Sequence, residues 1–513
     1  MAHPGSTQPD KAYRLLRSIL NVAVDDDKIP LNPCRIKGAG KETADERPVV
    51  RPQDVLKIAH ASAELDHDPQ MPSSRCVGGP IRPSHFGLGL GLVSMAALAI
   101  RVAYVLSYTR FQNGTLYDSF WYYSTTIGLH SGQFFREPFS FSPTAAHPPM
   151  TTLLVAAGDY VVGLHAGTTS SLLVMAVLGT AVVLCVGLLG RAVAGPWVGL
   201  VAAGLAALAP NFWMPSGILM SETPAMLFMA LILLAVVHLM RSPTVGAAIL
   251  LGLACGCEAL VRAELILFVP GLLVPAVLMT RPVPLPRHLL LLGVGLAATA
   301  LVLAPWVGRN LATFKDATYI STADGGTLLG STCPQTYYGP DIGLWDLQCA
   351  TSLKVKGDES VRSAVKLHVA LHYAEHHLNR LPLVMLARVG REWDLYKPLQ
   401  MAQVEQGEGR PYVGSVAGLG FYYALVPFAL AGVVVLRRRR IQQWFLLVPA
   451  GVVTLVSVFV IALVRYRAPF EVCLVVLAAP SIVLVVQRLR YRWAEPTPTP
   501  EEISVDEFLD LPS

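Results

Sequence analysis

The chain has 513 residues, of which 53% are hydrophobic and only 15% are charged. Soluble globular proteins carry about 25% charged residues, so this composition excludes an ordinary soluble enzyme or binding domain and indicates a membrane protein. The net charge of +5 is small and its arginines cluster beside apolar segments. That pattern is typical of membrane topology, so nucleic acid is not an expected partner.

Residues 1–80 are polar, and we expect a short soluble segment there without a cleavable signal peptide. Residues 13–24 form an amphipathic pattern that predicts a helix, which Pro30 would end. The stretch 69–83 is rich in Pro, Gly and Ser and predicts a linker. This segment therefore leads from a small soluble unit into the first apolar run.

Long apolar runs fill most of the chain after residue 86, and a run of about 18 or more apolar residues predicts a membrane span. The segment 149–164 is short and holds Asp159 and His165, so we interpret it as a juxtamembrane or re-entrant helix, with a crossing there as the alternative. The fold class that follows is an all-α polytopic membrane protein with about ten transmembrane helices. The predicted spans are 86–106, 170–190, 197–213, 222–240, 246–262, 264–280, 289–307, 418–436, 443–463 and 468–486.

Arginine clusters set the expected orientation, because Lys and Arg gather on the cytoplasmic side. The block Arg437–Arg440 then lies inside, which places the polar stretch 309–417 outside. That stretch is too long for a simple connection, so we predict a small extracytoplasmic domain that serves as a lid or recognises an acceptor. The expected organisation is a soluble segment 1–80, a transmembrane catalytic module 86–308 with a first outer loop 107–149, the extracytoplasmic domain 309–417, C-terminal transmembrane helices 418–487 and a cytoplasmic tail 488–513.

Cys333 and Cys349 lie in the predicted extracytoplasmic domain. An oxidising compartment permits a disulfide between them. The sequence leaves open whether the bridge forms.

The first outer loop carries an acid among aromatic residues. Asp118 opens the sequence Asp-Ser-Phe-Trp-Tyr-Tyr, which includes Tyr122 and Tyr123, and the loop ends in His147-Pro148-Pro149. A carboxylate can accept the proton of a sugar acceptor, and aromatic faces can cover a sugar ring. The alternative is an ordinary aromatic belt at the membrane surface with a solvated acid.

Glu222 is a second acid at the predicted outer face. It begins the span 222–240, where an ionisable group is costly unless it is used or paired. Together with Asp118 and His147 it could form one site for proton transfer, and a divalent cation near a phosphate is a possible cofactor that no residue pattern establishes. The alternative is that Glu222 only favours the N-terminus of its helix electrostatically.

Several arginines also lie at predicted outer ends of spans, against the usual charge bias. A phosphate held by guanidinium groups would explain them. The alternatives are a local charge pair at a helix junction and contact with lipid headgroups. The charged residues concerned are Arg262, Glu264, Arg309, Arg465 and Arg467.

Taken in order over residues 86–490, these motifs resemble the GT-C superfamily of membrane glycosyltransferases. The resemblance is to the protein O-mannosyltransferases, the aminoarabinose transferases of lipid A and their actinobacterial homologues. The motifs that carry it are the Asp118 loop, His147-Pro148-Pro149, Ser221-Glu222, Arg262-Ala263-Glu264, Pro305-Trp306 with Arg309-Asn310, Arg391-Glu392-Trp393 and Arg465-Tyr466-Arg467.

The resemblance implies a multi-pass enzyme of the plasma membrane with an extracytoplasmic active site. It would transfer mannose or another hexose or pentose from a polyprenyl-phosphate donor to a lipid, glycan or protein acceptor, with inversion. It implies that Asp118 acts as base or orients the acceptor, that Glu222 is the second acid, and that His147 faces the donor phosphate. Arg465 or Arg467 would hold that phosphate.

Two other interpretations differ in class. A transporter or flippase for a lipid-linked or anionic substrate also needs many spans, but transporters carry internal repeats and polar breaks near mid-span. Residues 12–60 resemble the end of the core-binding domain of phage-type tyrosine recombinases, so a DNA-binding fragment fused to a membrane protein is the third interpretation. The chain enters the membrane where a recombinase catalytic domain should follow, so recombination is not expected.

Overall fold

The chain divides into two units, and the description below concerns the second, Gln70–Ser513. Apart from Asn21, the recombinase-like stretch 12–60 lies outside the described residues, as does the tail beyond residue 494. The residues that the computed structural model describes are Asn21, Val77, 82–109, 118–162, 168–280 and 283–494.

The described residues form helices and no β-strand, as the sequence predicts. The first half contains α3 (Pro83–Ser107), α4 (Asp118–His130), α5 (Met150–Val162), α6 (Thr168–Ala194), α7 (Pro196–Leu208), α8 (Pro210–Trp213), η3 (Pro215–Gly217), α9 (Glu222–Arg241), α10 (Val245–Val261), η4 (Ala263–Leu267), η5 (Val269–Leu273), α11 (Val274–Leu278) and α12 (Leu285–Thr313). The second half contains α13 (Asp324–Ser331), α14 (Pro334–Tyr337), η6 (Gly339–Asp341), α15 (Leu347–Thr351), α16 (Glu359–His376), α17 (Leu381–Glu392), α18 (Pro398–Gly407), α19 (Tyr412–Arg438), α20 (Trp444–Phe459), η7 (Val464–Arg467) and α21 (Ala468–Ala494).

Six helices among the described residues are long and apolar enough to cross a membrane, or seven if the bent pair α7 and Pro210–Gly217 counts as one span. Three further segments where we predicted spans form helices of 16 or 17 residues: Val245–Val261, Ala263–Leu278 and Trp444–Phe459. The multi-pass architecture is therefore confirmed, while the count of ten stays a prediction. Helix α5 has 13 residues, or about 20 Å at 1.5 Å per residue, too short to cross an apolar core of about 30 Å.

Helix α21 is the central helix of the bundle. It packs against α19, α7, α9, α20 and α6, and most of its apolar window is buried. Close backbone approach explains part of this packing, because a Cβ atom at Gly432 of α19 would collide with the carbonyl oxygen of Leu477 in α21. The segment that leads into α21 is η7, so the fold puts the two arginines of η7 at the centre of one end of the bundle.

A buried arginine stabilises the break between α7 and α8. Pro210 cannot donate a backbone hydrogen bond and begins the new helix. The side chain of Arg101 is fully buried, and its guanidinium donates to the carbonyl oxygens of Ala206 and Phe212 on either side of the bend. A charged side chain inside a membrane is costly unless it has partners. Here the Arg101 guanidinium donates hydrogen bonds to carbonyl oxygens that have lost their helical partners at the break.

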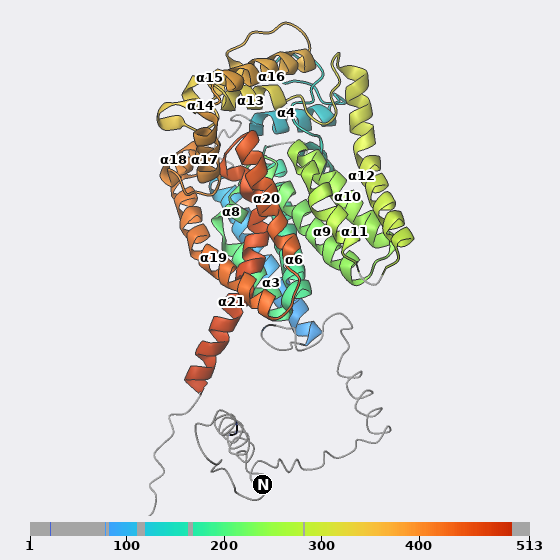
Figure 1. Ribbon diagram of the computed structural model, residues 1–513, viewed down its shortest axis with the longest axis vertical. Helices are drawn as coiled ribbons and strands as arrows, with labels where there is room; N and C mark the ends of the chain where they lie inside the picture. Colours follow the sequence, from blue (N-terminus) through green and yellow to red (C-terminus); the bar gives the residue numbers. More distant parts are fainter. Residues whose placement is uncertain are drawn as a thin grey trace, which may run out of the picture. The chain divides into compact units, whose positions relative to one another are not determined.

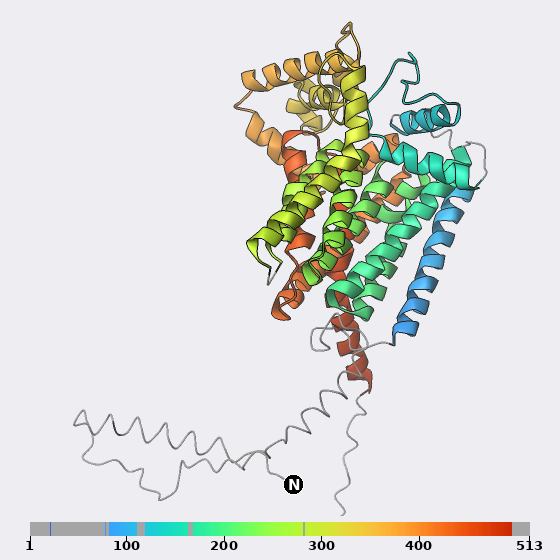
Figure 2. The same ribbon diagram turned by 90° about the vertical axis from the view of Figure 1, so that its right-hand side faces the viewer.

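The polar helices α13–α18, which we call the cap domain, gather at one end of the bundle (Figures 1 and 2). Helix α4 lies at the same end. The basic ends of α19 and α21 lie at the opposite end, where Arg437 and Arg438 end α19. This charge distribution matches the orientation that the sequence predicts, with the cap domain on the side away from the arginine clusters.

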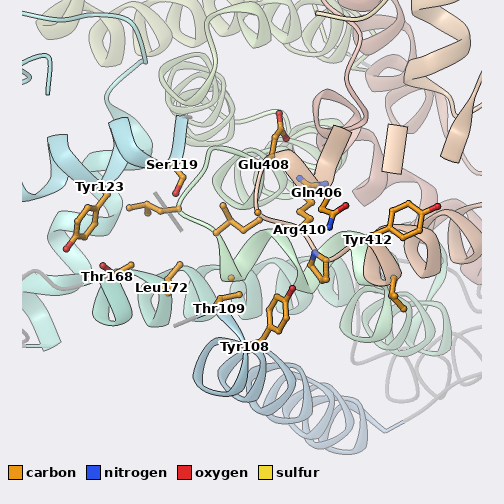
Figure 3. Close-up of a pocket in the computed structure, with 16 residues that line it drawn as sticks. Tyr108, Thr109, Ser119, Tyr123, Thr168, Leu172, Gln406, Glu408, Arg410 and Tyr412 are labelled. Atoms are coloured by element: carbon orange, nitrogen blue, oxygen red, sulfur yellow. The ribbon is translucent and has the colours of Figure 1, made fainter. Parts of the chain in front are cut away.

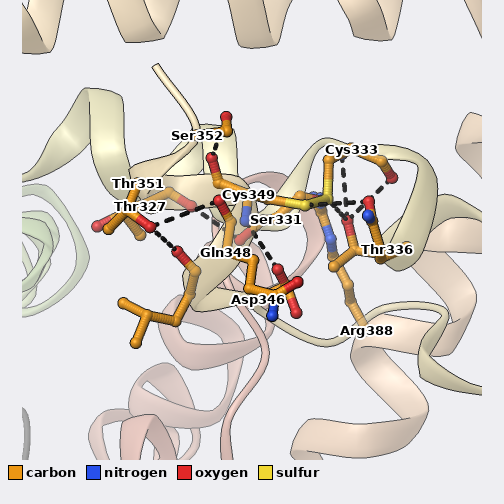
Figure 4. Close-up of a disulfide and its surroundings, with 12 residues drawn as sticks. Thr327, Ser331, Cys333, Thr336, Asp346, Gln348, Cys349, Thr351, Ser352 and Arg388 are labelled. Carbon is orange, nitrogen blue, oxygen red and sulfur yellow. Dashed lines mark hydrogen bonds between the residues drawn. A yellow bond between two sulfur atoms is a disulfide. The ribbon is translucent and has the colours of Figure 1, made fainter. Parts of the chain in front are cut away.

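The cap domain contains the disulfide between Cys333 and Cys349, which the sequence left open (Figure 4). Arg388 of α17 lies beside it and donates to the carbonyl oxygen of Ser331 at 2.6 Å. The bridge therefore connects the α13–α14 turn to α15, next to the buried Arg388 of α17.

Replacing both bridged cysteines by serine is expected to lower the free energy of unfolding of the cap domain by about 3 kcal/mol, because a crosslink across roughly 15 residues restricts the unfolded chain by that amount. Thermal melting of the purified protein in detergent measures the effect. Reducing agent should lower the melting temperature of the wild type and leave the double variant unchanged. Equal melting temperatures of wild type and variant would contradict the stabilising role.

Candidate functional site

A cavity of about 950 Å³ lies between the cap domain and the end of the bundle. Its lining comes from α4, the α10–η4 junction, η7, and the cap helices α13, α15, α16 and α18. Six of the ten residues predicted for the site line this cavity, although they come from four distant parts of the chain. They are Asp118, Tyr122, His147, Arg262, Glu264 and Arg465.

Asp118 begins α4 and forms the shortest ion pair of the cavity. Arg465 of η7 donates from Nη2 to Asp118 Oδ2 at 2.6 Å, and His147 Nε2 lies 3.7 Å from Asp118 Oδ1. Burial raises the pKa of the Asp118 carboxyl, but Arg465 and His147 outweigh it and lower that pKa to about 2. The carboxylate is therefore ionised at any physiological pH, and in this geometry it is a weak proton acceptor.

His147 lies between aromatic rings and the carboxylate. The Tyr122 ring centroid is 4.9 Å and the Trp121 ring centroid 6.0 Å from the imidazole. Burial lowers the pKa of His147 more than Asp118 raises it. The imidazole is therefore predominantly neutral near pH 7 and can donate one hydrogen bond into the cavity.

Glu222 does not line this cavity, and its side chain is buried beside Arg262 and Arg410. Its Oε1 lies 3.2 Å from Arg262 Nη2 and 3.6 Å from Arg410 Nη2. Arg262 also donates from Nε to Ser221 Oγ at 2.7 Å and from Nη1 to the Arg465 carbonyl oxygen at 3.2 Å. Glu222 is thus paired with two arginines, and its role as a second catalytic acid stays a prediction.

Two predicted phosphate-binding arginines do not line this cavity. Arg309 donates to the carbonyl oxygens of Thr144 and Phe135 and so fastens the first loop to α12. Arg467 is buried and pairs at 2.9 Å with both Asp394 and Glu471. Both arginines were singled out because they lie at predicted outer ends of spans. In each case contacts within the protein account for that position.

A second cavity of about 660 Å³ lies between α3, α6, the η3–α9 link and the α18–α19 link (Figure 3). Tyr123 and Ser119 of α4 line it, so the predicted pair of tyrosines is divided between two cavities. Glu408 lines both cavities, and its Oε1 lies 3.5 Å from Arg465 Nε. Glu408 was not predicted; the signal available was its place in Gly407-Glu408-Gly409-Arg410, directly before an apolar span.

Among the described residues no cluster of three or more His, Cys, Asp or Glu side chains has the arrangement of a metal site. Asp118 and Glu222 belong to separate clusters joined through Arg262 and Arg465.

Comparison with known proteins gives one family and several solved structures. Residues 146–307 match the family described as dolichyl-phosphate-mannose-protein mannosyltransferase. No curated protein matches the chain, and none of the findings supports the resemblance of residues 12–60 to a recombinase.

The oligosaccharyltransferase AglB from Archaeoglobus fulgidus, solved with an inhibitory peptide and a dolichol-phosphate, is 15% identical, with a TM-score of 0.49 over 80% of this chain and 51% of that chain. This chain thus spans about half the length of that protein. ArnT from Cupriavidus metallidurans bound to undecaprenyl phosphate is 14% identical, with a TM-score of 0.37 and 79% of each chain covered. Its apo form is 16% identical, with a TM-score of 0.33 and 78% of each chain covered.

Proposed function

We propose that this chain is a member of the GT-C superfamily of membrane glycosyltransferases and that it moves a sugar from a polyprenyl-phosphate donor to an acceptor hydroxyl at the extracytoplasmic face of the plasma membrane. The observation that carries the proposal is the meeting of Asp118, His147, Arg262 and Arg465 in one cavity at the cap end of the bundle. Acids and arginines converging beside an apolar bundle suit a substrate with a lipid tail and an anionic head.

The arginines suit the leaving phosphate. Arg465 and Arg262 line the cavity, and the guanidinium carbon of Arg262 lies 4.6 Å from the centre of the Tyr466 ring. As the bond between the sugar and the phosphate breaks, negative charge grows on the phosphate oxygens. Fixed cations near those oxygens stabilise that charge without reorganisation. His147 is the neutral donor that would contact the same group.

Asp118 suits an orienting role better than that of a base. Its ion pair with Arg465 and its low pKa disfavour proton uptake. A carboxylate held in this way can accept a hydrogen bond from a sugar or acceptor hydroxyl, while Tyr122 and Trp121 supply apolar ring faces beside it. The acceptor oxygen would attack the anomeric carbon on the face opposite the phosphate, so the configuration is inverted.

The side of the membrane follows from two features. Arginine clusters end α19 and α21 at the far end of the bundle, and such clusters favour the cytoplasm. The disulfide of the cap domain favours an oxidising compartment. Both features support an extracytoplasmic cavity. Mannose is the first donor sugar to test because of the matched family, followed by other hexoses and pentoses, each with lipid, glycan and protein acceptors.

The test is transfer by the purified protein in liposomes. Polyprenyl phosphates carrying labelled mannose, another hexose or a pentose are supplied with membranes of the producing cell as the acceptor source, with and without a divalent cation. A labelled product together with free polyprenyl phosphate is the expected result. Movement of the labelled lipid between leaflets without any product would favour the flippase interpretation instead.

A further inference from the structure

The two cavities of the site meet at a single side chain. Glu408 is the residue common to both linings among the described residues, while Asp118 lines the larger cavity and its neighbour Ser119 the smaller one. The Glu408 side chain is 14% exposed, and Figure 3 shows it at the edge of the smaller cavity. A group that reaches in from either cavity would therefore pass this carboxylate.

Glu408 and Asp118 share Arg465 unequally. Arg465 Nη2 donates to Asp118 at 2.6 Å, while its Nε lies 3.5 Å from Glu408 Oε1, beyond a well-formed hydrogen bond. Asp118 has His147 as a second partner. Glu408 has no second side-chain partner within the described residues, so its carboxylate oxygens remain available to a substrate hydroxyl.

The loop that carries Glu408 is fixed by its neighbours. Arg410 donates to Glu405 Oε1 at 2.6 Å and lies 3.6 Å from the buried Glu222. Gly409 has a φ of +92°, a conformation that favours glycine and lets the chain turn directly from α18 into α19. The backbone position of Glu408 is thus set by buried ion pairs, as a preorganised reacting group requires.

We propose that Glu408 is the proton acceptor for the acceptor hydroxyl. This inference rests on the proposed glycosyl transfer. In the step, the hydroxyl oxygen forms a bond to the anomeric carbon, the bond from that carbon to the phosphate oxygen breaks, and its electron pair leaves with the polyprenyl phosphate. The hydroxyl proton passes to the Glu408 carboxylate and returns to solvent or to the phosphate before the next turnover.

The charges around Glu408 suit this role. Burial raises the pKa of its carboxyl to about 7; Arg465 and Arg410 oppose the rise, and Glu222 and Asp118 add to it. General bases act best when their pKa lies near the working pH. Because Glu408 must be deprotonated to accept a proton, the rate should increase with pH through about 7 and level off above it.

The experiment compares Glu408→Gln, Glu408→Asp and wild type in the liposome transfer assay across pH 5–9. We expect Glu408→Gln to lower kcat by about a hundredfold or more, the range for loss of a general base, with little change in donor KM. The acidic limb of the pH profile should disappear in Glu408→Gln and persist, shifted, in Glu408→Asp. The matched control is Glu375→Gln, an exposed carboxylate of α16, which should behave as wild type.

Glutamine can still accept a hydrogen bond from Arg465, so Glu408→Gln separates proton transfer from simple positioning. A variant that keeps the wild-type kcat and acidic limb would overturn the inference. Absence of transfer by the wild type itself would instead count against the proposed function. Gel filtration and thermal melting of each variant identify any that fail to fold, and Glu408→Asp then decides the question through its pH profile.

Discussion

Replacing Asp118 by asparagine is expected to lower the rate of sugar transfer by about a hundredfold to a thousandfold, the range for removal of one preorganised polar group, while the protein still inserts and folds. The charge that loses its partner is Arg465, which is 12% exposed and keeps Glu408 as a second partner. The Asp118 charge fixes the direction of Arg465 and attracts His147, and the neutral amide would release both.

The variant should lose kcat rather than donor affinity, because Arg465 and Arg262 keep their charge. Its residual activity should retain the acidic limb, since that limb belongs to Glu408, but shifted to lower pH, because the Asp118 charge no longer raises the pKa of Glu408. Initial rates against donor concentration at several pH values measure both effects. Asp316→Asn, at an exposed position before the cap domain, is the matched control. Normal turnover by Asp118→Asn would remove Asp118 from the proposed site.

The sequence predicted the outline of the fold from apolar runs, because bilayer spans need long apolar helices. It was less informative where helices are short or broken. The segments Val245–Val261 and Trp444–Phe459 are shorter than a usual membrane span. The chain also bends by 74° after α7, at Pro210, and a hydropathy profile does not predict the direction of a helix after a proline. The count of spans depends on these segments.

The sequence analysis looked for charged residues at the predicted outer ends of spans, and this criterion also led to residues that line the larger cavity. Asp118 and Arg465 are 347 positions apart, yet both flank apolar runs that end on the same side, so a shared location could be predicted. The criterion could not tell which side chains turn inward. Arg465 and Arg467 belong to one turn of 3₁₀-helix, and only their packing partners send one to the cavity and the other into the core.

Glu408 was missed for a different reason. It lies in a polar stretch where solvated charges are expected, so neither composition nor periodicity marks it. Its burial comes from tertiary contacts: the cap domain closes over η7, and Arg410 turns back toward Glu405 and Glu222. Sequence patterns report local periodicity, whereas this site also depends on contacts between distant segments, such as that of Asp118 with Arg465, 347 positions apart.

The second large effect concerns the pair Arg465 and Arg467. Arg467→Ala is expected to destabilise the fold by about 3–5 kcal/mol, the usual cost of removing one partner of a buried ion pair, because Asp394 and Glu471 would lose their shared cation. The Tyr422 ring would also lose the guanidinium stacked 3.8 Å from its centre. Thermal melting in detergent, and the yield of monodisperse protein, measure this loss.

Arg465→Ala should do the opposite and keep the fold while it abolishes transfer. Its partners Asp118 and Glu408 remain partly solvated, at 30% and 14% exposure, so they tolerate the loss better than the buried acids around Arg467. Binding of labelled polyprenyl phosphate should weaken in Arg465→Ala and, per folded molecule, stay close to wild type in Arg467→Ala. Arg287→Ala, at an exposed position on the basic end of α12, should change neither quantity. If Arg467→Ala were stable and lost only the binding of polyprenyl phosphate, Arg467 would itself contact the donor. The assignment of Arg465 to binding and Arg467 to structure would then be wrong.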